Sequence, residues 1–272
     1  MKLMKVAIDF GISNTDIAVS NGTNIDFFTL PSKKINNLIL DEIFNYLNID
    51  IKDVDKIAVT GGKSDSLENI YRNVEVIKVN ETDAIGKGVI EIYSINEPFL
   101  AISAGTGTAC IHHQNGEFNY IGGIAIGGGT LKGLSNLVLN DPSIDEVTKK
   151  AIVGHRDNID LLIGDVVNEI GVLGSSVTAS NFAKLKKADD VSEDDVAAAL
   201  LNMIGEVIGT IAYLNAAICG VNKVHFIGRV STNEYIKNAV DERLKLANMQ
   251  GIFEDNREYG TVIGALKHIT TN

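Results

Sequence analysis

The sequence has few of the residues that would build a disulfide framework, a proline-rich linker or a nucleic-acid surface. It contains two cysteines, three prolines and no tryptophan among 272 residues. Cys110 and Cys219 lie in apolar stretches without metal-site spacing, which favours small buried side chains in a reducing compartment. Lysine and arginine number 24 against 35 acidic residues, and the net charge of −11 argues against nucleic acid or an anionic membrane as partner.

Long uninterrupted apolar runs are also missing, so we expect no segment to span a bilayer. The opening MKLMKVAIDF reaches Asp9 too early for a secretory signal and is typical of a first strand. With 45% hydrophobic and 22% charged residues, the chain should bury a core, and we expect a cytoplasmic protein with a small ligand. Because the chain is acidic, a polyanionic ligand would have to be held by backbone amides, helix N-termini and a metal ion.

The order of predicted elements repeats once along the chain. Residues 4–30 read as three strands joined by turns, with a small-residue turn after the first strand. Residues 98–123 show the same arrangement, and strands alternating with helices follow each meander. This pattern predicts an α/β protein of two duplicated domains, residues 1–92 and 93–272, with a ligand in the cleft between them.

Helical spacing of apolar residues marks the segments that should cover these sheets. Helices are expected over 38–49, 82–94, 131–139, 143–154, 192–220, 232–247 and 260–269. Thr82 or Asp83 should cap the second of them, and Ser192 and Gly220 should bound the long apolar one. Residues 158–167 read as a strand and residues 171–185 as a loop.

Two turns with similar chemistry occupy equivalent places in the two halves. Asp9 at a strand end precedes Gly11, Ser13 and Asn14, so the acid could hold a metal while the turn wraps a phosphate. The same residues also suit an ordinary hairpin turn. In the second half, the run from Ser103 to Thr108 has the same two interpretations. As a facing pair, the turns could clamp a polyphosphate.

Two further glycine-rich stretches follow buried strands. Residues 120–134, YIGGIAIGGGTLKGL, interleave glycine with isoleucine, and Gly127, Gly128 and Gly129 lead directly into a helix whose N-terminus could meet an anion or a ribose. Gly228 ends the strand KVHFI, where a nucleobase could lie against the backbone. A P-loop motif and a G-x-G-x-x-G after the first strand are both missing, which excludes those two nucleotide folds.

Together these four loops resemble the superfamily of actin, hexokinase and the chaperone ATPases, and nearly the whole chain resembles the type II (eukaryotic-like) pantothenate kinases. The matching segments are TGGK at 60–63, NETDA at 80–84, AGTGT at 104–108, GGGTLKGL at 127–134, NIDLLIGDVV at 158–167, TASNF at 178–182, the block 194–229 and GTVIGAL at 260–266. The resemblance implies two duplicated actin-like ATPase (ribonuclease H-like) domains with an interdomain nucleotide cleft. It also implies an ATP- and Mg²⁺-dependent kinase of pantothenate that forms a homodimer.

The resemblance assigns roles to individual residues. Glu81 falls on the catalytic base and Asp9 on the acid associated with Mg²⁺; without the resemblance, Glu81 would be an ordinary carboxylate in the first turn of a helix. The second phosphate loop corresponds to Gly105, Thr106, Gly107 and Thr108, and the nucleotide side to Gly127, Gly128, Gly129 and Gly228. The substrate side corresponds to Gly61, Gly62, Ser103, Tyr120, Ala179 and Ser180, of which Ala179 and Ser180 lie in the loop that closes over the neighbouring subunit's substrate in family dimers.

Two positions depart from the family pattern. Asp16 stands where members commonly carry a phosphate-loop lysine, and it would repel phosphate unless it points away. Tyr120 stands where the family has a pantothenate-contacting arginine, and losing such a charged hydrogen bond costs about 1.5–3 kcal/mol if nothing replaces it. Lys63, Lys132 or Arg156 could replace it. The alternatives left open are a kinase for another small hydroxyl compound and a nucleotide-binding activator ATPase.

Overall fold

The computed structural model describes residues 3–36, 38–62, 64–141, 143–167, 174–185 and 191–270, and it is organised around two mixed sheets. The N-terminal sheet has the strand order β3-β2-β1-β4-β6-β5. Its strands are β1 (Met4–Phe10), β2 (Asn14–Ser20), β3 (Ile25–Pro31), β4 (Val54–Gly61), β5 (Ile70–Tyr71) and β6 (Val74–Lys78). The first three form an antiparallel meander, and β4 and β6 extend it in parallel from β1.

The C-terminal sheet repeats this plan with the order β13-β12-β7-β8-β9. Its strands are β7 (Phe99–Ala104), β8 (Thr108–Gln114), β9 (Glu117–Ile124), β12 (Lys223–Ile227) and β13 (Gln250–Ile252). Here too a meander, β7 to β9, continues on one edge into two parallel strands. The duplication predicted from the two small-residue turns is therefore confirmed.

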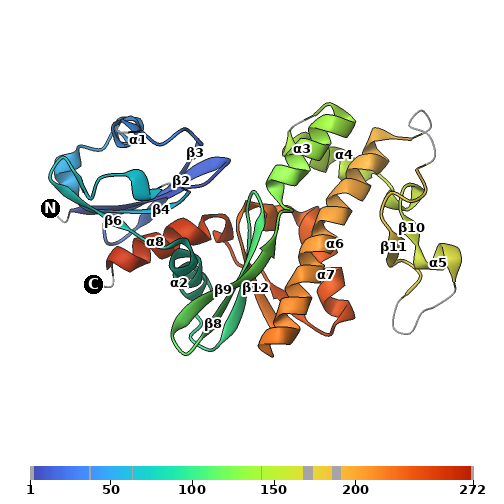
Figure 1. Ribbon diagram of the computed structural model, residues 1–272. Helices are drawn as coiled ribbons and strands as arrows, with labels where there is room; N and C mark the ends of the chain where they lie inside the picture. Colours follow the sequence, from blue (N-terminus) through green and yellow to red (C-terminus); the bar gives the residue numbers. More distant parts are fainter. Residues whose placement is uncertain are drawn as a thin grey trace.

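The helices cover the sheets and fill the space between them (Figure 1). They are α1 (Ile39–Leu47), α2 (Glu81–Tyr93), α3 (Gly128–Leu139), α4 (Ile144–Val153), α5 (Ile163–Val166), α6 (Glu193–Cys219), α7 (Glu234–Leu246) and α8 (Gly260–Thr270). A small third sheet, β10 (Leu161–Leu162) with β11 (Thr178–Ser180), lies beyond α6 at the end of the molecule farthest from the N-terminal sheet. We call the two main sheets with their covering helices the N-terminal and C-terminal lobes.

Helices α2 and α8 lie between the two sheets and connect the two lobes. One face of this helix pair packs on a row of alanines from the N-terminal sheet, Ala7, Ala18 and Ala58. The other face of α2, with Ile85 and Val89, packs on the C-terminal sheet. Because α2 belongs to both interfaces, the domain boundary expected after residue 92 stays a prediction.

The two helices approach so closely that glycine is required where they cross. A methyl group added at Gly264 would lie 1.8 Å from the carbonyl oxygen of Ala84, and one added at Gly88 would lie 1.9 Å from that of Gly260. Such contacts are far inside van der Waals distance, so any larger side chain would push α8 away from α2. This crossing fixes where the first turn of α2, with Glu81, lies relative to both sheets.

Helix α6 is the core helix of the C-terminal lobe. Ser192 caps its N-terminus by accepting a hydrogen bond from the backbone of Asp194, and Gly220 ends it in the left-handed conformation, as predicted. An 18-residue window has a mean hydropathy of 1.6, so by length and composition this helix could cross a membrane, contrary to our expectation that no segment could. Of that window 67% is buried within the protein, as in the core helix of a globular protein.

Three local predictions, of a helix cap, a strand and a loop, differ from the structure. The N-cap of α2 is Asn80, whose side chain accepts from the backbone of Thr82, and not Thr82 or Asp83. Within the segment expected as a strand over 158–167, only Leu161–Leu162 form a strand, β10, and the next four residues form the short helix α5. The loop expected over 171–185 contains β11, and residues 168–173 lie outside the described part of the chain.

The glycine crossing gives a first prediction. Gly264→Ala should lower the free energy of unfolding by about 2–3 kcal/mol, because the added methyl group overpacks the α2–α8 contact. Urea denaturation followed by circular dichroism measures this. The matched control is Gly133→Ala, in the exposed middle of α3, where an added methyl group meets nothing within 4 Å. It should stabilise by about 0.5–1 kcal/mol through helix propensity alone. Equal effects of the two substitutions would contradict the proposed role of Gly264.

Candidate nucleotide and acceptor site

The first predicted loop is a tight turn between β1 and β2. A methyl group at Gly11 would lie 2.7 Å from the backbone oxygen of Asn14, so the turn admits only glycine there without rearrangement. The hydroxyl of Ser32 donates to the carbonyl oxygen of Gly11 at 2.7 Å and ties the turn to the end of β3. Ser13 is exposed at the tip, which leaves its hydroxyl facing the opposite lobe.

The second predicted loop joins β7 and β8 and meets the first. Its backbone closes on itself, with the amide of Gly105 donating to the carbonyl oxygen of Gly107 at 2.9 Å. The hydroxyls of Ser13 and Thr106 lie 3.0 Å apart, one from each lobe. The neighbouring Thr108 donates its hydroxyl to the carbonyl oxygen of Ile126. Two turns separated by 93 residues in sequence are thus in hydrogen-bond contact across the interlobe boundary.

The three glycines at the start of α3, with Gly127 as its N-cap, leave little room for side chains because their backbone lies directly on the second loop. The amides of Gly128 and Gly129 donate to the carbonyl oxygens of Gly105 and Thr106 at 2.8 and 3.0 Å. A methyl group at Gly127 would lie 2.7 Å from both of those oxygens. Within the protein these amides hold the second loop in place, and the start of α3 is brought to the same cleft.

Gly228 and Gly61 lie at two further close contacts between segments of the site. Gly228 has a φ of +90°, and a methyl group there would lie 2.5 Å from the carbonyl oxygen of Ala104. Gly61 has a φ of +83°, and a methyl group there would lie 2.5 Å from a carboxylate oxygen of Asp9. The amide of the next residue, Gly62, donates to the carbonyl oxygen of Phe10 at 3.0 Å. Left-handed backbone and close approach both require glycine at these two positions.

Three acidic residues, Asp9, Asp16 and Glu81, lie close enough together for their charges to interact. Removal from water, followed by the charges of Glu81 and Asp16, raises the pKa of Asp9 from 3.8 to about 7, although Arg229 acts in the opposite direction. Glu81 is the first residue of α2 and is exposed. Asp9 and Asp16 are directly opposite each other on β1 and β2, so their side chains share one face of the sheet.

Asp16, the predicted source of repulsion, is paired with a cation from the other lobe. Its carboxylate accepts from a guanidinium nitrogen of Arg229 at 2.8 Å and from the hydroxyl of Thr29 at 2.7 Å. Arg229 directly follows Gly228 at the end of β12. The sequence offered no signal for this contact, because the partners are 213 residues apart.

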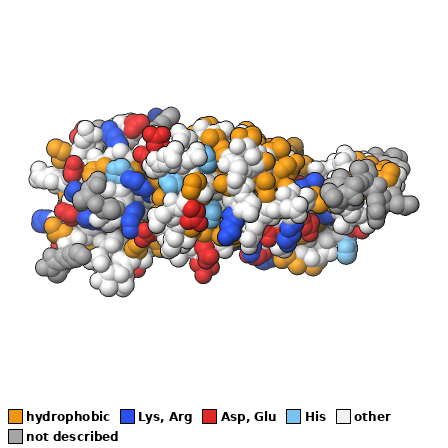
Figure 2. Space-filling model, turned by 90° about the horizontal axis from the view of Figure 1, so that it is seen from below, with side chains coloured by type: hydrophobic (Ala, Val, Ile, Leu, Met, Phe, Trp, Pro, Cys, Tyr) orange, Lys and Arg blue, Asp and Glu red, His pale blue; other side chains and the backbone are white. Residues whose placement is uncertain are grey.

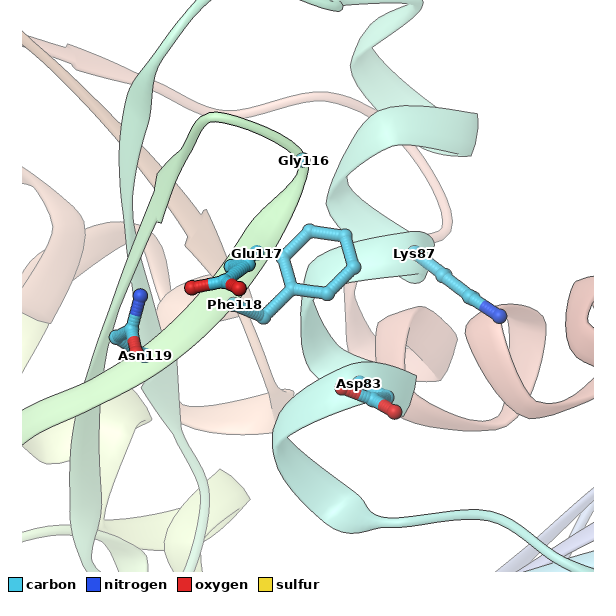
Figure 3. Close-up of a pocket in the computed structure, with 6 residues that line it drawn as sticks. All are labelled: Asp83, Lys87, Gly116, Glu117, Phe118 and Asn119. Atoms are coloured by element: carbon cyan, nitrogen blue, oxygen red, sulfur yellow. The ribbon is translucent and has the colours of Figure 1, made fainter.

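A cavity of about 390 Å³ lies between the first two turns of α2 and the β8–β9 hairpin (Figure 3). In that view the ring of Phe118 points toward the helix, while Glu117 and Asn119 on either side of it point the other way. Lys87 lines the cavity from α2 and its amine lies 2.9 Å from a ring nitrogen of His268. The cavity therefore adjoins the helix that carries Glu81 and the strand that carries Tyr120.

Tyr120 lies at the surface of β9, with 61% of its side chain exposed. A methyl group added at Gly123 would lie 2.9 Å from its hydroxyl, so the phenol lies along its own strand. Ser103 is half-buried on β7, which is separated from β9 by β8, and it pairs with Ala109 of β8. Among the residues named as replacements for the missing arginine, Lys63 lies outside the described residues and Lys132 is exposed on α3.

Arg156, the third named replacement, is held in a buried polar network far from Glu81. It donates to the side chain of Thr178 and the backbone of Ser176. Thr178 in turn donates to Glu206, which also accepts from Asn181 and pairs with Arg243 at 2.8 Å. Burial opposes ionisation of Glu206, but these hydrogen bonds and the charge of Arg243 outweigh it and lower its pKa.

This network holds the strand that carries Ala179 and Ser180. Both residues are exposed on β11, at the end of the molecule opposite to α2 and the N-terminal sheet (Figure 1). The structure therefore brings the glycine loops, Asp9 and Glu81 together where the two lobes meet, but it does not bring Ala179 and Ser180 there within the same chain. The buried Glu206 that anchors them was missed, since it reads in sequence as one polar residue of an apolar helix.

Comparison with known proteins covers nearly the whole chain. The Fumble family model matches residues 11–267. The chain is 29% identical over 97% of both proteins to a type II pantothenate kinase of Bacillus thuringiensis subsp. konkukian. It is 30% identical to one from Bacillus cereus, over 79% of this chain and 80% of that protein. A pantothenate kinase 1 of Arabidopsis thaliana is 37% identical over 48% of this chain and 37% of its own length.

Solved structures with low sequence identity share the fold. The activator of the 2-hydroxyisocaproyl-CoA dehydratase from Clostridium difficile, with bound ADPNP, superposes with a TM-score of 0.66 at 16% identity, covering 99% of this chain and 97% of that one. A ROK family glucokinase from Streptomyces griseus, in complex with glucose and AMPPNP, gives a TM-score of 0.65 at 11% identity, covering 99% and 100%. The two-lobed actin-like architecture predicted from the sequence is confirmed.

The raised pKa of Asp9 predicts how stability changes with pH. The folded protein takes up this proton more readily than the unfolded chain, so the stability contributed by Asp9 falls as the pH rises from about 4 to about 7. Asp9→Asn, which carries no charge, should therefore raise the melting temperature more at pH 8 than at pH 5. Scanning calorimetry of the nucleotide-free protein measures both, with the exposed Asp26→Asn on β3 as control. The same shift at both pH values would show that Asp9 is not desolvated.

Proposed function

Because the chain belongs to the Fumble family, a family of pantothenate kinases, we propose that it transfers the γ-phosphoryl group of ATP to the primary hydroxyl of pantothenate. This reaction is the first step of coenzyme A biosynthesis. The observation that carries the proposal is the convergence of two phosphate-type loops, through Ser13 and Thr106, at a cleft that also contains Asp9 and Glu81.

Glu81 is proposed as the general base. It is exposed at the start of α2, close enough to Asp9 to raise the pKa of that residue, and it borders the cleft rather than the protein interior. A carboxylate in this place would accept the proton of the acceptor hydroxyl as its oxygen attacks the γ-phosphorus, which breaks the bond to the ADP leaving group. The cavity lined by Asp83, Lys87 and Phe118 lies beside the same helix, α2, and we propose that the rest of the acceptor binds there.

Asp9 is proposed to hold Mg²⁺. Among the described residues no cluster of three or more metal-ligating side chains exists, so a resident all-protein metal cage is not what this cleft provides. A single carboxylate fits Mg²⁺, which keeps several waters and is completed by phosphate oxygens. The bound ion would neutralise phosphate charge, and it would also offset the neighbouring charges of Glu81 and Asp16 that oppose ionisation of Asp9.

The activator ATPase alternative has its own support in the fold, since one structural neighbour is such an activator. An activator of that kind usually carries cysteines for a cluster at a dimer interface. Here the only two cysteines, Cys110 and Cys219, are unpaired members of the packed interior of the C-terminal lobe, and Cys110 is fully buried. The positions of these cysteines therefore favour the phosphotransferase function over the activator function.

We also propose that the protein is a cytoplasmic homodimer in which each site borrows the β11 loop of the partner. Ala179 and Ser180 are exposed and rigidly supported by Glu206, yet they lie far from Glu81 of their own chain. Large apolar side chains are exposed on the C-terminal lobe, including Leu137 on α3, Ile152 on α4 and Ile218 on α6. Figure 2 shows hydrophobic side chains gathered over the C-terminal lobe on the lower face.

The proposed reaction predicts acceptor-dependent ADP release. The purified protein with ATP and Mg²⁺ should release ADP in a coupled assay with pantothenate, and more slowly with pantetheine or a panel of sugars. Glu81→Gln should lower kcat by about 10²–10⁴-fold, the usual loss for a general base, while ATP binding is retained. Turnover with another acceptor but not with pantothenate would reassign the substrate, with Tyr120 as the first residue to examine.

A matched control for Glu81→Gln is Glu146→Gln. Glu146 is also an exposed carboxylate in the first turn of a helix, α4, and it forms an ion pair with Lys149 of the same helix. If Glu81 merely stabilises its helix, the two substitutions should have similar small effects on stability and none on kcat. A selective loss of kcat in Glu81→Gln supports the base.

The shared site predicts complementation between two inactive variants. Glu81→Gln removes the base, and Ala179→Trp should block the loop that reaches the partner. Mixed after unfolding and refolding together, the variants should recover about a quarter of wild-type activity, because half of randomly formed C2 dimers are mixed and one of their two sites is intact. Light scattering checks the dimer. Absence of any recovery while dimers form would mean that each chain builds its own site.

A further inference from the structure

Two like charges lie next to each other in the N-terminal lobe, and a cation from the C-terminal lobe compensates them. Asp9 and Asp16 are cross-strand neighbours on β1 and β2, and like charges in this position repel each other. Glu81 adds a third negative charge to the same region. A cleft of this kind would repel a polyphosphate unless a cation faced it.

Arg229 supplies that cation from the C-terminal lobe. One terminal nitrogen donates to Asp16 at 2.8 Å and to the hydroxyl of Thr29 at 3.0 Å. With the carboxamide of Asn14 turned so that its oxygen faces the guanidinium, the other terminal nitrogen donates to it at 2.7 Å. Three residues of the β1–β3 meander thus hold one arginine.

The backbone around Arg229 aims it at the junction of the two loops. It follows Gly228, whose left-handed conformation lets the chain lie against Ala104 at the start of the second loop. Asn14 and Asp16, which it contacts, follow Ser13, the residue that meets Thr106. Despite three partners, 38% of the Arg229 side chain is still exposed. The guanidinium therefore keeps a surface available to a ligand.

We propose that Arg229 is the side-chain cation that binds the phosphates of the nucleotide, and that Asp16 is the positioning residue that holds it across the cleft. A guanidinium presents five donors in a planar fork, so it can keep its bond to Asp16 while it donates to phosphate oxygens. This inference deepens the proposed function, because it names how the same donor site binds ATP. It also explains why an aspartate is tolerated in a phosphate loop.

The test is the affinity of the full-length protein for a nucleotide series without any acceptor. Calorimetric titration with adenosine, ADP and AMPPNP in the presence of Mg²⁺ separates the base and ribose from the phosphates. Arg229→Met should weaken AMPPNP binding by about 10- to 100-fold, the cost of a lost hydrogen bond to a charged group, and ADP binding by less. Adenosine binding should change by no more than about twofold, since it carries no charge.

Arg72→Met is the matched control. Like Arg229, Arg72 is an arginine paired with an aspartate, Asp41, at 2.7 Å, but it lies on the surface of the N-terminal lobe and follows β5 rather than either loop. It should leave all three affinities unchanged. An equal loss for adenosine and AMPPNP in Arg229→Met would overturn the proposal, because the residue would then act by holding the lobes together rather than by binding phosphate.

The role of Asp16 is tested by substituting it both in the wild-type protein and in the Arg229→Met variant. Asp16→Asn alone should weaken AMPPNP binding, because Arg229 loses its support. In the Arg229→Met background the same substitution should not weaken binding further, since only a repelling charge is removed. Asp16→Lys in that background should restore part of the affinity by placing the cation on the other lobe. Equal loss from Asp16→Asn in both backgrounds would refute the positioning role.

These outcomes separate this inference from the proposed function. Failure of the wild-type protein to bind AMPPNP would count against a kinase altogether. Tight binding that Arg229→Met does not weaken would count against this inference alone. Because no acceptor is present, the result does not depend on whether pantothenate is the substrate.

Discussion

Backbone-to-backbone contact around the second loop is the constraint on which the rest of the cleft depends. The amides of Gly128 and Gly129 bond the carbonyls of the loop at Gly105 and Thr106, and Gly228 lies against Ala104. Gly127, Gly129 and Gly228 can lie this close to the second loop only because they carry no side chain. The position of Thr106 against Ser13, the start of α3 and the direction of Arg229 all follow from this contact.

The charged side chains of the site come from different lobes according to their sign. The N-terminal lobe carries the acids, Asp9 and Asp16, with Glu81 on the helix between the lobes, and the C-terminal lobe contributes Arg229. A protein with a net charge of −11 cannot attract a polyphosphate by its overall field, so the cation has to be local and fixed. The same acids that would repel phosphate make the cleft suitable for a divalent cation, which is the form in which ATP is used.

Those parts of the site that depend on local backbone chemistry could be predicted from the sequence. The glycines Gly11, Gly61 and the run Gly127 to Gly129 indicate tight turns and close backbone approach in the sequence itself, and the order of strands in the two meanders repeats. Contacts between distant segments could not be predicted, because nothing near Asp16 indicates a partner 213 residues away. The α2 cap was missed for a different reason: Asn80, Thr82 and Asp83 are all good capping residues, and only the path of the chain selects one.

The last helix has a consequence for how the protein is made. Helix α8 covers the alanine face of the N-terminal sheet, and the amine of Lys5 donates to the carbonyl oxygen of Ile269 at 2.8 Å. Residues at the two ends of the chain therefore complete one hydrophobic layer. During vectorial synthesis on the ribosome, the first sheet emerges early, but this face stays uncovered until residues 260–270 have been made and have left the exit tunnel. The N-terminal lobe therefore begins to form first but is completed only after the C-terminal lobe has been translated.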